Sequence, residues 1–356
     1  MDIEGIKRII TDQRYEIDHL YKSRRLIERD LPEDKLIQSL KHPNILAVLG
    51  VRRCGKSVCS HMLLKGKEYG YINFDDERLY GIDAGDLNLV LQAFYELYST
   101  ELEYFMLDEI QNVSGWELFA NRLRRTKKVV LTGSNAKLLS GELATHLTGR
   151  YSDVTLFPFS FYEFLEFKEI EPDIHSTRSI ARIKNALKEY MDVGGFPEVY
   201  LFGKEVTARI YEDIIYKDII SRHDIRNKRS FSQIAKYLVS NFSGEFSYRK
   251  LCGATSIRNV HTVKDYAGYL ESSYIVLVVE RFSFKLKEQI KSDTSALPEI
   301  KTVLDSYIGE QKEHNQWMKE HLIKMDEHLL KMDEHNQWIK EHNQNLEKIL
   351  EKLVEK

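Results

Sequence analysis

The segment ILAVLGVRRCGKSVC, residues 45 to 59, constrains this chain more than any other part of it. Its apolar run ILAVLG is typical of a buried parallel strand, and KSVCSHMLLKG has the spacing of the start of a helix. Between them, GVRRCGKS matches the pattern G-x-x-x-x-G-K-S. In this pattern glycines let backbone N–H groups approach phosphate oxygens, and the helix N-terminus adds partial positive charge. The segment therefore predicts a site for the phosphates of a nucleotide.

Individual side chains of this loop have distinct predicted roles. We expect Lys56 to reach the β- and γ-phosphates of ATP and the Ser57 hydroxyl to ligate Mg²⁺. The alternative is a glycine turn followed by an exposed lysine. Cys54 is expected to be either a small residue in a tight loop or a thiol that senses oxidants. The residues predicted to line the nucleotide are Gly50, Arg52, Arg53, Cys54, Gly55, Lys56, Ser57 and Val58.

A pair of acids follows a second predicted strand, Tyr104 to Leu107. Asp108 at the end of a strand beside the loop strand would hold the hydration shell of Mg²⁺, and Glu109 would orient or deprotonate the attacking water. The alternative is an acidic helix N-terminus, because carboxylates favour that end of the helix dipole. The glycine loop upstream favours the first interpretation, with ATP and Mg²⁺ as the cofactors.

Two further segments supply catalytic candidates. A buried strand from Lys127 to Leu131 is followed by TGSN, so either Ser134 or Asn135 is predicted to contact the γ-phosphate or the water. The alternative is an ordinary turn and helix cap. Arg150 precedes a fifth predicted strand, 154–157, and would contact the γ-phosphate of its own chain or of a neighbouring subunit, or form a surface ion pair. The catalytic candidates are Lys56, Glu109, Asn135 and Arg150.

Taken together, these motifs resemble a family of prokaryotic AAA-type ATPases that is abundant in archaea. The resemblance covers about residues 1 to 290 and rests on GVRRCGKS, YINFDDERL, FMLDEIQNVSGWELFANRLRR, LTGSNAKLLSGELATHLTGRY, LFPFSFYEFL and GGFPEVY. It implies an α/β fold with a five-stranded parallel core, followed by a helical lid to which GGFPEVY belongs, a winged helix and a nuclease-like domain. It also implies the roles given above for Lys56, Ser57, Asp108 and Glu109.

The segment after the lid has a winged-helix pattern. Residues 231–242 have helical spacing, and then a short helix, a turn, a helix over 259–271 and a strand over 274–279 are predicted. Residues 201–290 carry 15 Lys and Arg against 10 Asp and Glu. The module is expected either to bind double-stranded DNA with its second helix in the major groove or to bind protein. The candidate DNA contacts are Arg258, Asn259, His261, Thr262 and Lys264.

The C-terminal segment departs from the family pattern. After RFSFKLKEQIK the dipeptide Glu-His recurs with a period of seven from 313–314 to 341–342, and the residues between follow a coiled-coil heptad with asparagines at some core positions. We therefore expect a coiled coil in place of the nuclease-like domain, forming a parallel homo-oligomer or binding a partner helix. The repeated histidines are expected on the flank, where they are either solvated or form a stripe of metal ligands.

Together these patterns predict an organisation in five parts. We expect a P-loop core at 1–165, a lid at 166–228, a winged helix at 229–290, a linker at 291–299 and a coiled coil at 300–356. No apolar run reaches the roughly 18 to 20 residues of a membrane span, and the N-terminus lacks the apolar core of a signal peptide, so a cytoplasmic location without membrane contact is expected. The leading function is an ATP-hydrolysing switch; the alternatives are a DNA-binding regulator whose shape depends on nucleotide, and a non-enzymatic assembly protein.

Overall fold

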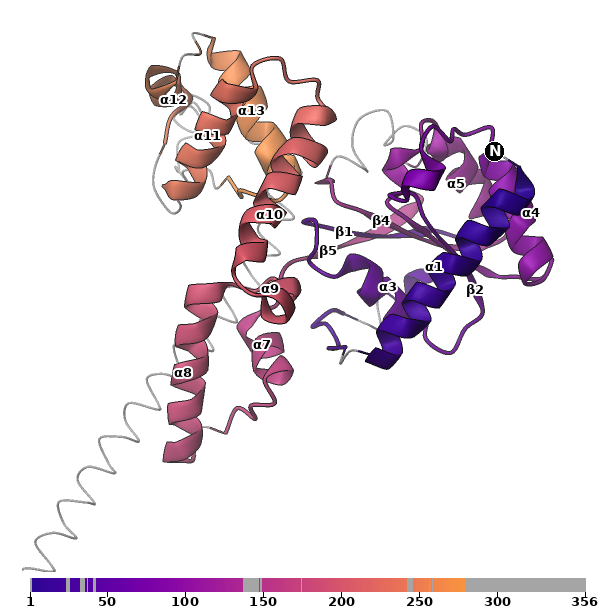
Figure 1. Ribbon diagram of the computed structural model, residues 1–356, viewed down its shortest axis with the longest axis horizontal. Coiled ribbons are helices and arrows are strands. Elements are labelled where there is room, and N and C mark those ends of the chain that lie inside the picture. The colour runs from indigo at the N-terminus through magenta and orange to yellow at the C-terminus, as the bar shows by residue number, and fades with distance from the viewer. Residues whose placement is uncertain are drawn as a thin grey trace, which may run out of the picture. The chain divides into compact units, whose positions relative to one another are not determined.

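The described part of the chain forms one compact unit in the computed structural model (Figure 1). The residues described are 2–23, 26–32, 36, 38–40, 43–136, 147, 149–173, 175–241, 246–255, 257 and 259–278. The predicted linker at 291–299 and the predicted coiled coil at 300–356 lie outside these residues.

Five parallel strands form a single sheet. They are β1 (Ile45–Gly50), β2 (Tyr69–Asn73), β3 (Tyr104–Asp108), β4 (Lys128–Gly133) and β5 (Tyr151–Leu156). Their order is β2-β3-β4-β1-β5, and each neighbouring pair is parallel. The carboxyl ends of all five strands therefore meet at one edge of the sheet, where ligands of open α/β sheets bind. The predicted five-stranded parallel core is confirmed, but the expectation that the strand of Asp108 lies beside the loop strand is wrong, because β4 lies between β3 and β1.

Helices cover both faces of this sheet. They are α1 (Ile3–Ser23), α3 (Lys56–Leu63), α4 (Leu87–Leu97) and α5 (Trp116–Leu123), with short turns η1 (Glu77–Leu79) and η2 (Ile110–Asn112). Side chains of β1 alternate between the faces. Leu46 and Val48 share an apolar cluster with Cys59 of α3, whereas Ala47 and Leu49 lie in the cluster of α4 and α5. Accordingly, α3 lies on the opposite face from α4 and α5 (Figure 1), which explains why the strands are apolar throughout.

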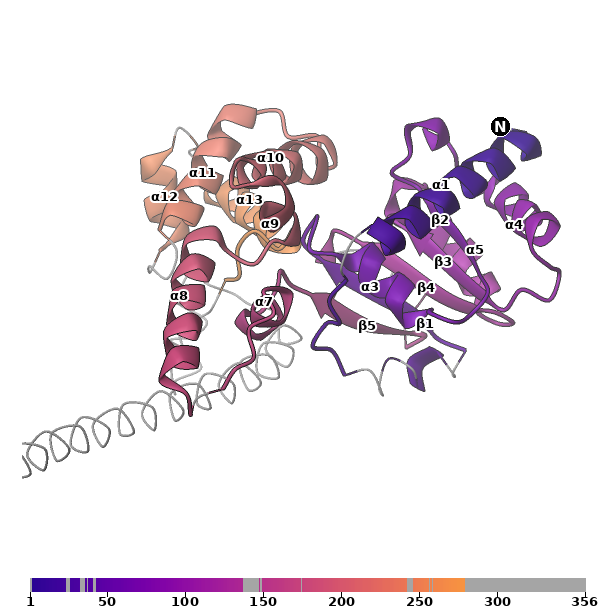
Figure 2. The ribbon, with the colours of Figure 1, turned by 60° about the horizontal axis from the view of Figure 1, so that its bottom comes forward.

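A helical region follows the sheet (Figure 2). Its elements are α7 (Phe161–Phe167), α8 (Thr177–Val193), α9 (Pro197–Phe202), α10 (Glu205–Asp213), the π-helical segment η4 (Ile214–Ser221), α11 (Lys228–Ser240), α12 (Tyr248–Ala254) and α13 (Val260–Ser272). Isoleucines of η4 and apolar residues of α11 and α13 belong to the same buried cluster as the α3 face of the sheet. None of the described helices is long and apolar enough to span a membrane.

One predicted element, the strand over 274–279, is wrong within the residues described, which end here at Val278. The chain leaves α13 in a turn in which Tyr274 has a φ of 59°, and the Ile275 N–H donates to the Leu270 carbonyl at 3.1 Å. The Tyr274 ring then packs edge-on against Phe157, 6.4 Å between centroids. Tyr274, Ile275 and Val276 thus pack against the apolar cluster, Leu277 is exposed, and the described part of the run pairs with no strand.

Candidate functional site

The nucleotide loop follows a backbone path that requires glycine. Gly50 has a φ of 145°, and a Cβ atom there would lie 2.0 Å from the Leu156 carbonyl oxygen. Gly55 has a φ of 100° and precedes the first residue of α3, Lys56. Arg53 between them also has a positive φ, 66°, in a region that is sparsely populated by non-glycine residues. The loop therefore presents its backbone at the start of α3.

Lys56 lies inside this loop rather than on the surface. Its side chain is 4% exposed, and its Nζ donates to the Val51 carbonyl at 3.1 Å. The same atom lies 3.7 Å from the Glu109 carboxylate. Lys56 is thus held between the loop and the end of β3, the place where the phosphate chain of a nucleotide would require a cation.

Asp108 ends β3 as a buried carboxylate, 1% exposed. Thr132 Oγ1 donates to its Oδ1, and the Tyr71 hydroxyl donates to its Oδ2 at 3.2 Å. Burial and the neighbouring charge of Glu109 raise the pKa of Asp108, whereas hydrogen bonds from Thr132 and Ser57 and the charge of Lys56 oppose the rise. The two predicted metal ligands, Ser57 and Asp108, are thus close enough for Ser57 to affect the pKa of Asp108.

Glu109 is held in a fixed orientation beside this acid. Its backbone is left-handed, with a φ of 52°, and its N–H donates to Thr132 Oγ1 at 3.1 Å. Gln111 Nε2 donates to its carboxylate. Because both its backbone and its carboxylate are bonded, Glu109 points along one direction at the carboxyl edge of the sheet.

Both candidates after β4 lie at the same edge and are buried. Ser134 is 1% exposed and its hydroxyl donates to Asp218 Oδ1 at 3.3 Å, and Asn135 is 5% exposed. Both candidates therefore lie at the carboxyl edge of the sheet, and the structure does not distinguish between them.

Arg150 lies at the opposite edge of the sheet. Its carbonyl accepts a hydrogen bond of 3.0 Å from the N–H of Ile45, the first residue of β1, whereas the loop begins at the last residue, Gly50. At about 3.3 Å per residue these edges are roughly 16 Å apart. Its side chain is exposed and forms no ion pair with the described residues. The geometry does not support action of Arg150 on the nucleotide of its own chain.

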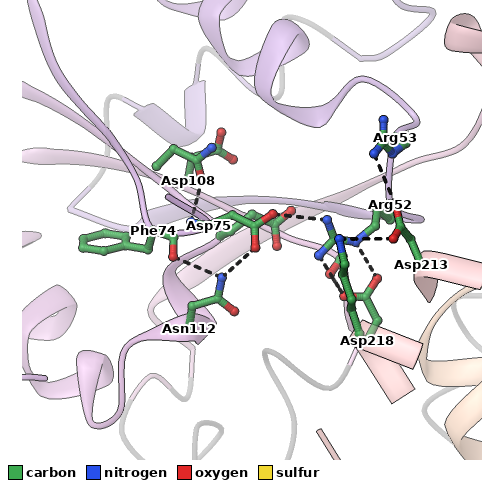
Figure 3. A network of polar contacts seen from close by, with 12 residues as sticks. Arg52, Arg53, Phe74, Asp75, Asp108, Asn112, Asp213 and Asp218 are labelled. Carbon is green, nitrogen blue, oxygen red and sulfur yellow. Dashed lines mark hydrogen bonds and ion pairs between the residues drawn. The ribbon is translucent and has the colours of Figure 1, made fainter. Parts of the chain in front are cut away.

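The two arginines of the loop contact carboxylates of the helical region (Figure 3). Arg52 donates to Asp218 through Nε at 2.9 Å and Nη2 at 3.2 Å, and to Asp75 through Nη1 at 3.2 Å. Burial lowers the pKa of Arg52, but the hydrogen bond to Asp218 and the charges of both acids outweigh burial, so the pKa is raised. Arg53 donates to Glu198 at 2.6 Å and Asp213 at 3.3 Å.

A buried ion pair beneath the loop was missed by the sequence reasoning. Arg29 and Glu163, 7% and 6% exposed, are joined by a hydrogen bond of 2.7 Å from Arg29 Nε. Arg29 also donates to the carbonyls of Cys54 at 2.8 Å and Phe157 at 2.6 Å. The only sequence signal was the capping pattern Ser160-x-x-Glu163 of α7, which marks a helix start but not a site. The pair therefore stabilises the loop through the bond from Arg29 to the Cys54 carbonyl.

Cys54 behaves as a packed residue of the loop. It is fully buried, and its Sγ donates to the Leu156 carbonyl at 3.2 Å. Burial is the largest influence on the Cys54 thiol and raises its pKa. Because the thiolate is the reactive form, this environment favours the structural alternative over oxidant sensing.

The candidate DNA contacts are only partly described. Arg258 lies outside the described residues. Asn259 caps α13, since its side chain accepts a hydrogen bond of 2.9 Å from the His261 N–H. His261 is exposed, and Thr262 and Lys264 are half-buried on the first turns of the helix. Asn259 therefore has a local role in the fold that does not depend on DNA.

Comparisons with known proteins identify two domains. A family described as an AAA domain matches residues 42–165, and a domain of unknown function (DUF8612) matches residues 184–295. The chain is 34% identical over 281 residues to the uncharacterized protein MJ1544 of Methanocaldococcus jannaschii, covering 75% of this chain but only 62% of that relative. It is 31% identical over 294 residues to an uncharacterized protein of Haemophilus influenzae, covering 76% of this chain and 71% of the relative. Among solved structures, the Walker-type ATPase PABY2304 of Pyrococcus abyssi matches with a TM-score of 0.49 and 17% identity, covering 70% of this chain and 90% of that one.

Proposed function

We propose that this chain, which carries an AAA domain and belongs to the same family as the uncharacterized Haemophilus influenzae protein, is an ATP-hydrolysing switch. The single observation that supports the proposal is that two residues of the loop lie beside the two acids at the end of β3. Lys56 Nζ lies 3.7 Å from the Glu109 carboxylate, and Ser57 lies beside Asp108 at the end of β3. These are the positions at which phosphate, metal and water would have to meet.

The residues present fit ATP and Mg²⁺. The backbone at Gly50 leaves no space for a Cβ atom, and the Ser57 hydroxyl and Asp108 carboxylate are the oxygen ligands that Mg²⁺ prefers. Bound Mg²⁺ would neutralise charge on the phosphate oxygens. Ser57 and Asp108 would hold the ion, and the backbone N–H groups at the start of α3 would bind the phosphates.

Lys56 and Glu109 would then act on the terminal phosphate and the water. Lys56 would exchange the Val51 carbonyl for phosphate oxygens, which separates it from Glu109. Glu109, held by Gln111, would orient the attacking water and accept its proton. Ser134 or Asn135 at the end of β4 would contact the γ-phosphate or the water.

Steady-state ATP turnover tests this proposal. Lys56→Ala and Glu109→Gln should each lower turnover by about 100-fold or more, whereas their surface counterparts Lys65→Ala and Glu101→Gln should leave it unchanged. Glu109→Gln should still bind ATP, because its role is in the hydrolysis step. Turnover that survives undiminished in both site variants would show that the activity arises elsewhere.

We also propose that helices α11 to α13 bind double-stranded DNA or a partner protein, with residues 166–228 as the lid and 229–290 as the binding module. The supporting observation is the first part of α13, where the cap Asn259 leaves His261 exposed and Lys264 lies one turn further. In a gel-shift assay, Lys264→Ala should weaken DNA binding and lower the salt dependence by about one counterion. The matched change Lys236→Ala on α11 should not; equal losses in both variants would contradict a specific role for α13.

For the C-terminal part we propose a coiled coil over 300–356 that forms a homo-oligomer or binds a partner helix. In such an assembly Arg150, at the far edge of the sheet, would contact the nucleotide of a neighbouring subunit. Sedimentation of the full chain against a chain that ends at Lys291 tests the first step. The two proteins should differ in oligomeric state, and a monomer in both cases would contradict assembly through the tail.

A further inference from the structure

Asp218 is a buried acid to which the proposed hydrolysis assigns no role. Its side chain is 2% exposed and accepts hydrogen bonds from Arg52 Nε at 2.9 Å and Nη2 at 3.2 Å. It also accepts from the Ser134 hydroxyl at 3.3 Å, and Arg222 lies 4.0 Å away. One carboxylate therefore connects the nucleotide loop, the end of β4 and the helical region.

The segment that carries Asp218 is an unusual helix. Residues 214–221 form π-helical turns that continue α10, and Ile214, Ile215, Ile219 and Ile220 of this segment are buried around the acid. π-helical turns are rare and occur frequently at functional sites. The buried isoleucines pack this segment into the apolar cluster, and the bonds of Asp218 to Arg52 and Ser134 connect it to the loop and to the end of β4.

Arg52 spans the carboxyl edge of the sheet between two acids. Its guanidinium bonds Asp218 on one side and Asp75, which follows β2, on the other (Figure 3). The charge of Glu109 also contributes to the raised pKa of Arg52. Arg52 thus belongs to the loop and joins the end of β2 to the helical region at the carboxyl edge of the sheet.

A terminal phosphate and Asp218 would compete for this arginine. A guanidinium forms the same paired hydrogen bonds with a phosphate as with a carboxylate. Two anions that approach the same edge repel each other, and Ser134, which contacts Asp218, is itself a candidate for contact with the γ-phosphate. The Nε and Nη2 atoms of Arg52, which bond Asp218, can therefore form their paired hydrogen bonds with only one of the two anions at a time.

We propose that Asp218 is a positioning residue that holds Arg52 in the empty protein and is exchanged for the γ-phosphate when ATP binds. Arg52 then pairs with the phosphate, and the η4 segment loses its bond to the loop. ADP lacks the terminal phosphate and leaves the Arg52–Asp218 pair intact. This inference rests on the proposed ATP binding and adds the way in which the helical region distinguishes ATP from ADP.

The nearby pair of Arg53 with Asp213 provides a matched control. Arg53 is 40% exposed and Asp213 is 23% exposed, so their contact is solvent-screened, and Asp213 also pairs with Lys217 at 3.1 Å. Asp213→Asn removes the same charge from the same helix, five residues away, without touching Arg52.

Nucleotide affinities of Asp218→Asn and Asp213→Asn, measured with fluorescent ATP and ADP analogues and Mg²⁺, test the proposal. Asp218→Asn should bind the ATP analogue roughly tenfold more tightly than the wild type, because a competing anion is removed, and should bind ADP within about twofold of the wild type. Asp213→Asn should change both affinities by less than about twofold. An Asp218→Asn variant that binds ATP no more tightly, or that loses ATP and ADP affinity equally, overturns the proposal.

Hydrogen exchange of the unaltered protein gives a second measurement that does not depend on the stability of a variant. A non-hydrolysable ATP analogue with Mg²⁺ should increase exchange in residues 214–221, and ADP with Mg²⁺ should not. If hydrogen exchange in residues 214–221 is the same with both nucleotides, the proposed replacement of Asp218 by the γ-phosphate at Arg52 is contradicted. If the wild-type protein binds neither nucleotide, both the proposed function and this inference are contradicted. If it hydrolyses ATP but shows the same hydrogen exchange with the ATP analogue and with ADP, only the inference is contradicted.

Discussion

Replacing Gly50 by alanine tests whether the nucleotide loop needs glycine for its backbone path. A Cβ atom here would lie 2.0 Å from the carbonyl oxygen of Leu156 and 3.2 Å from Cys54 Sγ. Leu156 pairs with Gly50 at the end of β5, so its carbonyl cannot move away without disturbing the sheet. The backbone conformation at a φ of 145° costs about 1–3 kcal/mol for a non-glycine residue, and the overlap adds about 1–3 kcal/mol. We expect a loss of about 2–6 kcal/mol in the free energy of unfolding.

The same change at Gly66 is a matched control. Gly66 has a φ of 79°, but no atom lies within 4 Å of the Cβ position, so only backbone strain of about 1–2 kcal/mol is expected. Urea unfolding followed by circular dichroism measures both losses. ATP binding should weaken in Gly50→Ala even where the protein is folded, because the loop must move away from Leu156, and should remain unchanged in Gly66→Ala.

The difference in unfolding free energy between Gly50→Ala and Gly66→Ala shows whether the overlap with Leu156 requires glycine at position 50. A Gly50→Ala protein that unfolds at the same urea concentration as Gly66→Ala and keeps its ATP affinity would refute the reasoning. It would mean that β5 moves aside at little cost and that the close approach of the loop to Leu156 does not determine the residue type.

Three further results are expected. Arg29→Met leaves Glu163 buried without its cation and should lower the free energy of unfolding by about 3–5 kcal/mol. The double variant Arg29→Met with Glu163→Leu should regain part of this loss, and no recovery would contradict the ion-pair account. The pKa of His61 is lowered to about 3 by burial and the charge of Arg14, whereas the unfolded histidine binds its proton near 6.5, so the free energy of unfolding should fall as the pH falls below about 6.5. The loss at pH 5, measured by urea titration, should be about 2 kcal/mol and should be absent in His61→Phe. If His61→Phe shows the same pH dependence as the wild type, His61 is not the source of that dependence. Arg150→Ala should lower ATP turnover only at protein concentrations at which the chain assembles, and a loss that is independent of concentration would contradict action on a neighbouring subunit.

Much of the site could be predicted from the sequence because its chemistry is local. The residues of GVRRCGKS are adjacent in the chain, and apolar runs before the loop and before Asp108 indicate buried parallel strands. Parallel strands end at one edge, so Ser57, Asp108 and Ser134 could be expected to lie near one another before any contact was known. The strand predicted over 274–279 failed because an apolar run indicates burial but not the presence of a partner strand.

What the sequence determined by itself is the glycine loop and the two acids at the end of β3, since each depends on residue type and short-range periodicity, whereas the five-stranded parallel core was implied by the family resemblance. Only the tertiary structure decided which distant charges meet. Arg52 and Asp218 are 166 residues apart, and Arg29 and Glu163 are 134 apart, and no local pattern links either pair. Likewise, Arg150 follows the loop in the sequence but lies at the other edge of the sheet because β5 runs parallel to β1. Such pairings follow from the packing of the whole chain, in which a buried charge requires a partner from whichever segment lies beside it.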